Sequence, residues 1–110
     1  MKKVLWFSRH NMSEDQAQDL KRIYGDVTIN QVSKTINSAY ELQDDINNSD
    51  VIAIVAPVNL QQQFLKLAEG KPVISARSKR LVDLNDDTKF IFVFDGWYQI
   101  LEVKVVTQDL

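Results

Sequence analysis

The chain has 110 residues, 45% of them hydrophobic and 25% charged, which is the size and composition of one globular domain. It contains no cysteine, which excludes a disulfide scaffold, a thiolate nucleophile and a zinc–thiolate site, and its single histidine, His10, leaves too few ligands for most transition-metal sites. The chain has 13 basic and 15 acidic residues, so its net charge is −2. It therefore has no overall positive field to attract duplex nucleic acid.

The N-terminal part of the chain predicts a strand, a helix and a second strand. Residues 4–7 are a continuous apolar block, which is typical of a strand covered on both faces. Ser13 and Gln16 have the spacing of a capping box, and Gly25 suits the end of the helix that they open. Residues 26–32 then alternate between apolar and polar, as a half-exposed strand does.

The same alternation of strands and helices continues to residue 76. The next elements are a helix opened by a second capping box of Ser38 and Glu41, an apolar strand over residues 51–56, a helix capped by Asn59 and stopped by Gly70, and a strand over residues 73–76. Such alternation with short links favours a parallel sheet with right-handed crossovers. We therefore expect residues 1–110 to form a single Rossmann-like or flavodoxin-like α/β domain of three layers, with four parallel strands and three helices. The first and third strands should be central and the second at an edge.

The last third of the sequence breaks this pattern. Residues 90–94 and 97–106 are strand-like runs joined by Asp95-Gly96, a dipeptide that favours the tight turn of a β-hairpin. We predict an antiparallel hairpin there, extending the sheet. The three phenylalanines of the first run share one face, which indicates core packing. Residues 77–88 are interpreted as a loop, with a strand fragment at 81–82.

Polar and basic residues follow the predicted parallel strands at their carboxyl ends, which meet at one edge of such a sheet. We expect these residues to form a basic rim for an anion, because guanidinium groups and the free amides of a helix start both favour phosphate. The expected ligand-binding residues are Ser8, Arg9, His10, Asn11, Lys34, Asn59, Arg77, Ser78, Lys79 and Arg80. The alternative interpretation is a polar turn at residues 8–11 and a solvated basic loop at 77–80.

The glycines argue against a tightly held dinucleotide. The chain has three of them, Gly25, Gly70 and Gly96, and each is explained by a helix end or a turn. Neither of the usual glycine-rich phosphate loops is present. We therefore expect no cofactor, and we interpret acidic pairs such as Asp44-Asp45 as solvated surface rather than a metal site.

Three functions are consistent with these residues. The first is a small regulatory module that holds a nucleotide or another phosphorylated anion at the basic rim. The second is a protein-interaction factor, such as a phage or mobile-element regulator or inhibitor, that acts through the hairpin edge. There Trp97 and Tyr98 would face a protein partner or a second copy. The third, an enzyme acting on phosphate esters, ranks last because one histidine supplies no set of base, nucleophile and orienting group.

Apolar runs in the sequence are too short for a membrane span or a signal peptide. The longest, residues 51–58, has eight residues, against the ~20 needed to cross a bilayer. The apolar stretch after Lys2-Lys3 ends after four residues, whereas a signal peptide needs about seven or more. The sequence therefore predicts a cytoplasmic protein without a membrane partner.

Overall fold

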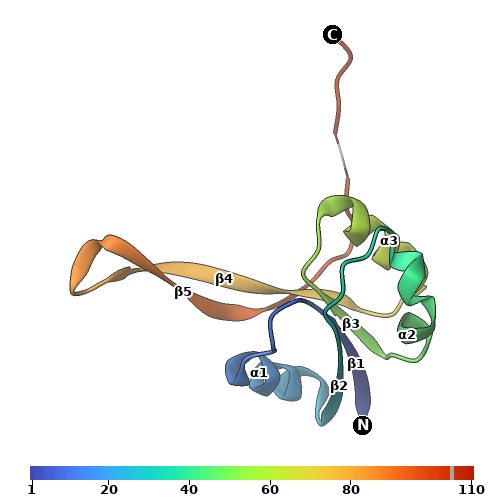
Figure 1. Ribbon diagram of the computed structural model, residues 1–110, viewed down its shortest axis with the longest axis horizontal. Helices are drawn as coiled ribbons and strands as arrows, with labels where there is room; N and C mark the ends of the chain where they lie inside the picture. Colours follow the sequence, from blue (N-terminus) through green and yellow to red (C-terminus); the bar gives the residue numbers. More distant parts are fainter. Residues whose placement is uncertain (105) are drawn as a thin grey trace.

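The computed structural model, which describes residues 1–104 and 106–110, contains one mixed five-stranded sheet (Figure 1). Its strands are β1 (Lys2–Phe7), β2 (Val27–Val32), β3 (Val51–Ile54), β4 (Val73–Asp83) and β5 (Asp86–Gln99). They lie in the order β2-β1-β3-β4-β5, and all neighbouring pairs are parallel except β4 and β5. The predicted placement of the first and third strands inside the sheet, with the second at an edge, is confirmed.

Helices cover both faces of the sheet (Figure 1). They are α1 (Glu14–Tyr24) on one face, and the 3-10 turn η1 (Ala39–Leu42), α2 (Gln43–Asn47) and α3 (Val58–Ala68) on the other. Val4 and Trp6 pack towards α1, whereas Leu5 and Phe7 pack towards α2 and α3. Because successive side chains of β1 enter opposite layers, all four of these residues are buried, which explains the unbroken apolar run. None of the described helices has the length and apolar character to cross a membrane.

Both predicted capping boxes form. The Ser13 hydroxyl accepts the Gln16 amide N–H at 3.1 Å, and the Gln16 side chain accepts the Ser13 N–H at 2.9 Å, so α1 begins where predicted. The box of Ser38 and Glu41 opens the short turn η1, which continues directly into α2. The second helix is therefore shorter and less regular than its sequence pattern suggests.

The start of α3 differs from the prediction. The residue that precedes the helix is Pro57, in an extended conformation, and Asn59 lies inside the first turn instead of capping it. Proline suits a helix start because the amide proton that it lacks would have no intrahelical partner there. At the other end, Glu69 and Gly70 both adopt positive φ, which ends the helix.

The C-terminal hairpin is antiparallel, as predicted, but its turn lies elsewhere. β4 continues through the predicted loop to Asp83, and β5 returns from Asp86, so the chain reverses at residues 84–85. The predicted turn at Asp95-Gly96 is wrong: both residues lie opposite Arg77 as a β-bulge in β5. Gly96 has φ +93°, and a bulge uses this conformation as readily as a tight turn does. The predicted strand over 97–106 ends at Gln99, and residue 105 lies outside the described residues.

Residues 77–96 form a two-stranded extension, here called the arm, that projects beyond β3 (Figure 1). The radius of gyration is 15.8 Å, against about 13 Å for a compact chain of this length. Phe90 and Phe92 share one face of the arm with Phe94, as predicted, but they are 50% and 71% exposed. The prediction that they pack in the core is therefore wrong, because no layer covers this part of the described sheet. Phe94 lies at the base of the arm, 5.8 Å from Trp97.

Candidate functional site

A pocket of about 360 Å³, here called the edge pocket, opens at the carboxyl ends of β1, β2 and β3. Its apolar wall consists of Phe7, Val32, Ile36, Val55, Pro57 and Leu60. Its polar rim consists of Ser8, Arg9, His10, Ser33, Lys34 and Thr35. Two cations and three hydroxyls thus surround an apolar hollow, and none of the lining residues is acidic.

The fold itself creates this hollow. β1 and β3 are neighbours, but the chain leaves β1 towards α1 on one face of the sheet and leaves β3 towards α3 on the other. The two connections diverge, and a crevice remains between them at the strand ends. Ligands in open parallel sheets bind in such crevices, so the location is the one that the strand order predicts.

Hydrogen bonds hold the loop after β1 in place. The Trp6 indole N–H donates to the His10 carbonyl at 2.9 Å, and the Gln31 amide donates to the Ser8 and His10 carbonyls, both at 3.1 Å. The His10 amide donates to the buried Ser8 hydroxyl at 3.1 Å. The loop is therefore preorganised by side chains of β1 and β2, and a ligand would not have to order it.

Arg9 joins the two sides of the rim. Its guanidinium donates to the hydroxyl of Thr35, in the loop that follows β2, where Lys34 is the adjacent residue. An arginine carries five N–H donors, and this bond uses one of them. Two cations from different loops thus lie at one rim, an arrangement that suits a phosphate or carboxylate group.

Only part of the predicted site comes together at this pocket. Ser8, Arg9, His10 and Lys34 line it, whereas Asn11 is exposed on the loop before α1 and is absent from its lining. Asn59 is exposed in the first turn of α3 and is also absent from the lining. The four remaining predicted residues lie within β4 on the arm: Arg77, Ser78, Lys79 and Arg80. The reason is that β4 passes beyond the edge of the parallel sheet instead of ending there.

Several residues of the pocket were not predicted from the sequence. Ser33 and Thr35 flank Lys34 and could have been found by the same rule of strand ends. Ile36 and Leu60 carry no such pattern, because an apolar residue beside a pocket has the same appearance in sequence as one in the core. The predicted partner residues lie at the base of the arm. Trp97 donates its indole N–H to the Gln16 carbonyl of α1 at 3.0 Å, and Tyr98 is 38% exposed.

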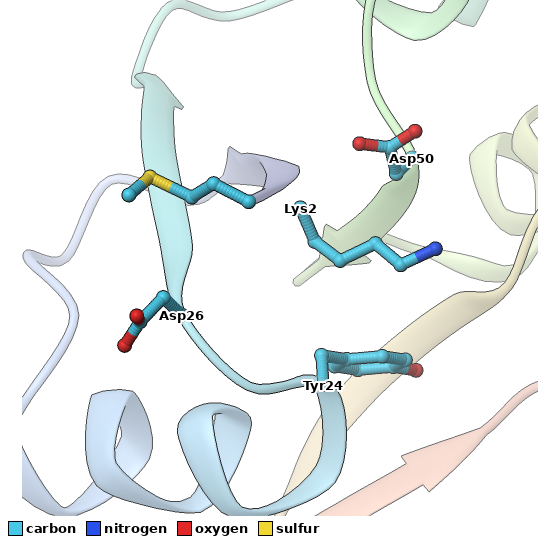
Figure 2. A pocket seen from close by; sticks show the side chains of 5 residues that line it. Lys2, Tyr24, Asp26 and Asp50 are labelled. Atoms are coloured by element: carbon cyan, nitrogen blue, oxygen red, sulfur yellow. The ribbon is translucent and has the colours of Figure 1, made fainter.

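A second hollow, of about 610 Å³, lies at the opposite edge of the sheet, among Met1, Lys2, Tyr24, Asp26 and Asp50 (Figure 2). Its carboxylates already have structural partners. Asp50 accepts the Lys3 amide at 2.8 Å, and Asp26 lies 3.6 Å from the Lys21 ammonium group. The hydrogen bond from the Lys3 amide lowers the pKa of Asp50, and the nearby charges of Lys2, Lys3 and Lys71 lower it further. The amino ends of parallel strands are not where such sheets bind ligands, so the edge pocket is the better candidate.

Within the described part of the chain, no three side chains of the metal-binding types converge on a common point. Comparisons of the chain with family models, curated proteins and solved structures found no match.

Proposed function

We propose that this protein is a small Rossmann-like binding module that holds a nucleotide, or a similar phosphorylated anion, in the edge pocket. The strand order β2-β1-β3-β4-β5 supports the flavodoxin-like form of this fold, in which the ligand lies at the junction of β1 and β3. The observation that carries the proposal is an apolar hollow at that junction with Arg9 and Lys34 at its rim.

The chemistry of the pocket favours a ligand with an apolar part and an anionic part. The apolar wall, which includes Phe7 and Leu60, favours a flat apolar group such as a nucleobase. Arg9 and Lys34 favour the phosphate, and the nearby hydroxyls supply further hydrogen bonds. Ligand pockets commonly measure ~300–1,000 Å³. A volume of about 360 Å³ suits a mononucleotide better than a dinucleotide.

Binding fits these residues better than catalysis does. His10 is the only histidine in the chain, and the Ser8 hydroxyl beside it already accepts the His10 amide. A phosphoester-processing enzyme would need a nucleophile, a base and a group that orients the base. The rim supplies cations and hydroxyls instead, which are groups that bind an anion.

The proposal can be tested by thermal unfolding with matched pairs of ligands. Each of the common nucleosides is compared with its 5′-monophosphate and with inorganic phosphate, and cyclic oligonucleotides extend the series. A monophosphate at 100 times its dissociation constant should add about 2.7 kcal/mol of stability, which raises the melting temperature by about 10 °C. The corresponding nucleoside should shift it less, because it lacks the charged group.

Variants locate the site. Arg9→Ala combined with Lys34→Ala should abolish the shift, whereas Lys66→Ala, which removes a cation from the exposed side of α3, should preserve it. A shift that survives the double substitution would place the ligand elsewhere. The absence of a shift with every phosphorylated compound would count against the proposed function.

A further inference from the structure

The outer edge of β5 is the longer of the two edges of the described sheet, because the other edge strand, β2, has only six residues. The sheet ends at this 14-residue strand, so its outward backbone groups have no neighbouring strand. Between Lys89 and Asp95 the strand carries five consecutive apolar residues, without a charge or a proline. Proteins commonly protect long edge strands with one of these, because an unprotected edge pairs with another strand.

The side chains along this edge are also exposed. Phe90, Ile91 and Phe92 are 50%, 49% and 71% accessible, and they alternate between the two faces of the arm. Leu81 and Val82 of β4 are exposed beside them. Contiguous apolar surface of this kind usually marks an interaction site.

We propose that β5 pairs with the β5 of a second copy of this chain, antiparallel and about a two-fold axis at Phe92, so that the two sheets become continuous. In this register Phe90 faces Phe94 of the other copy, Ile91 faces Val93, and Phe92 faces its own equivalent. Aromatic and β-branched cross-strand pairs of this kind stabilise antiparallel sheets. The inference does not depend on the proposed ligand.

Charge selects this register over its neighbours. Centring the axis on Phe92 places Lys89 opposite Asp95 of the other copy at both ends of the apolar run. Moving the axis to residue 91 would bring Asp87 opposite Asp95, two like charges. Moving it to residue 93 would set Ile91 against Asp95. Only the central register combines opposite charges at the ends with apolar pairs between them.

The charge of the arm also favours a second copy over a nucleic acid. Its four cations, Arg77, Lys79, Arg80 and Lys89, are balanced by four carboxylates, Asp83, Asp86, Asp87 and Asp95. Lys79 lies 3.8 Å from Asp95, and Arg80 lies over the ring of Phe90 at 4.3 Å. A phosphate backbone would meet as many negative as positive groups here. A surface with both signs can be complementary to itself, as a two-fold interface requires.

Sedimentation or light scattering over a concentration series in the micromolar range tests the proposal. The wild-type protein should form a concentration-dependent dimer. Phe92→Lys places two like charges on the axis and should raise the dissociation constant of the dimer by at least about tenfold. The matched control is Tyr40→Lys, which replaces an exposed apolar side chain by lysine on η1, outside the arm. A monomeric wild type, or equal dissociation by both variants, would overturn the proposed edge pairing.

Two further variants test the register. Lys89→Asp alone should weaken the dimer, and adding Asp95→Lys should restore it, because the opposite charges then exchange places. Since the chain has no cysteine, Phe92→Cys introduces a single thiol on the axis, within disulfide reach of its equivalent. Mild oxidation should give a covalent dimer of Phe92→Cys but not of Leu84→Cys at the exposed tip. The reverse pattern, or a double charge variant no tighter than Lys89→Asp, would contradict the register. Circular dichroism checks that each variant is folded.

Discussion

Single side chains join parts of this protein that lie far apart in the sequence. Trp97 connects the base of the arm to α1 through its hydrogen bond to the Gln16 carbonyl, and its ring lies edge-on to Trp6 at 5.7 Å. Lys71 donates to the carbonyls of Ile46 and Asn47, both at 3.0 Å, and so ties the end of α2 to the segment before β4. Such contacts fix the relative positions of elements that local sequence patterns only identify.

Asp50 is a residue of this kind, and its charge predicts a response to acid. Its hydrogen bond from the Lys3 amide, together with the surrounding lysines, lowers its pKa in the folded protein. A carboxyl group with a lowered pKa stabilises the fold above the ordinary aspartate value of about 4, and this contribution is lost as the pH falls through the folded value. Asp50→Asn should therefore reduce stability at neutral pH and flatten the loss of stability on acidification.

Urea unfolding at a series of pH values between about 6 and 3 measures the slope of the free energy of unfolding against pH. Asp44→Asn, which removes an exposed carboxylate from α2, is the control. Part of the slope should remain in Asp50→Asn. The pKa of Asp19 is also lowered, chiefly by its hydrogen bond from Arg22, and that of Glu41 by the amides of Asn37 and Ser38. A slope in Asp50→Asn equal to that of the wild type would contradict the stabilising role of the Asp50 carboxylate.

At the scale of elements, the bulge at Asp95-Gly96 is where β5 changes from a strand of the body to a strand of the arm. Gly96 has φ +93°, a conformation that side-chain-bearing residues rarely adopt. A Cβ atom added there would meet no heavy atom within 4 Å, so the constraint lies in the backbone and not in the available space.

Gly96→Ala should therefore destabilise the protein by about 1–2 kcal/mol without disturbing the packing around it. Thermal unfolding should show a melting temperature lower by several degrees. Gln99→Ala, at an exposed position of the same strand, serves as the comparison, because its backbone does not require a positive φ. An unchanged melting temperature in Gly96→Ala would mean that the backbone of the bulge relaxes without loss of stability. The bulge would then not determine the course of the arm.

At the scale of the whole molecule, the body and the arm are separable. Among the described residues, the buried core draws only Val73, Ile74 and Ile100 from the C-terminal hairpin and its flanking segment, and all three lie outside the arm. The two core layers between sheet and helices are complete without residues 77–93, and the edge pocket contains none of them.

Shortening the arm tests this separation. Replacing residues 79–93 by Asn-Gly would join the paired residues Ser78 and Phe94 through a two-residue hairpin turn. The shortened protein should fold with a melting temperature within a few degrees of the wild type and should retain ligand binding. It should be monomeric at concentrations where the full chain is a dimer. Failure to fold would show that the arm contributes to the stability of the body.

The sequence alone determined most local elements of residues 1–76 and the position of β2 at the edge of the sheet, with β1 and β3 inside it. Capping residues such as Ser13 and Gln16 act within one helical turn, and the unbroken apolar run of residues 4–7 reports burial on both faces, so each can be recognised without the rest of the fold. The loops after β1 and β2 meet at one edge for the same topological reason. Arg9, His10 and Lys34 were therefore predictable as neighbours.

The tertiary structure decided which segments of the chain pair as strands and which faces of those strands are covered. Whether residues 77–83 form a loop or pair with 86–94 depends on contacts between segments, and Asp95-Gly96 has the same preferred backbone in a tight turn and in a bulge. Apolar residues such as Phe92 follow the same pattern in a covered strand and in an exposed arm. Burial depends on a second surface that the strand's own sequence does not contain, and only the assembled fold shows where that surface is absent.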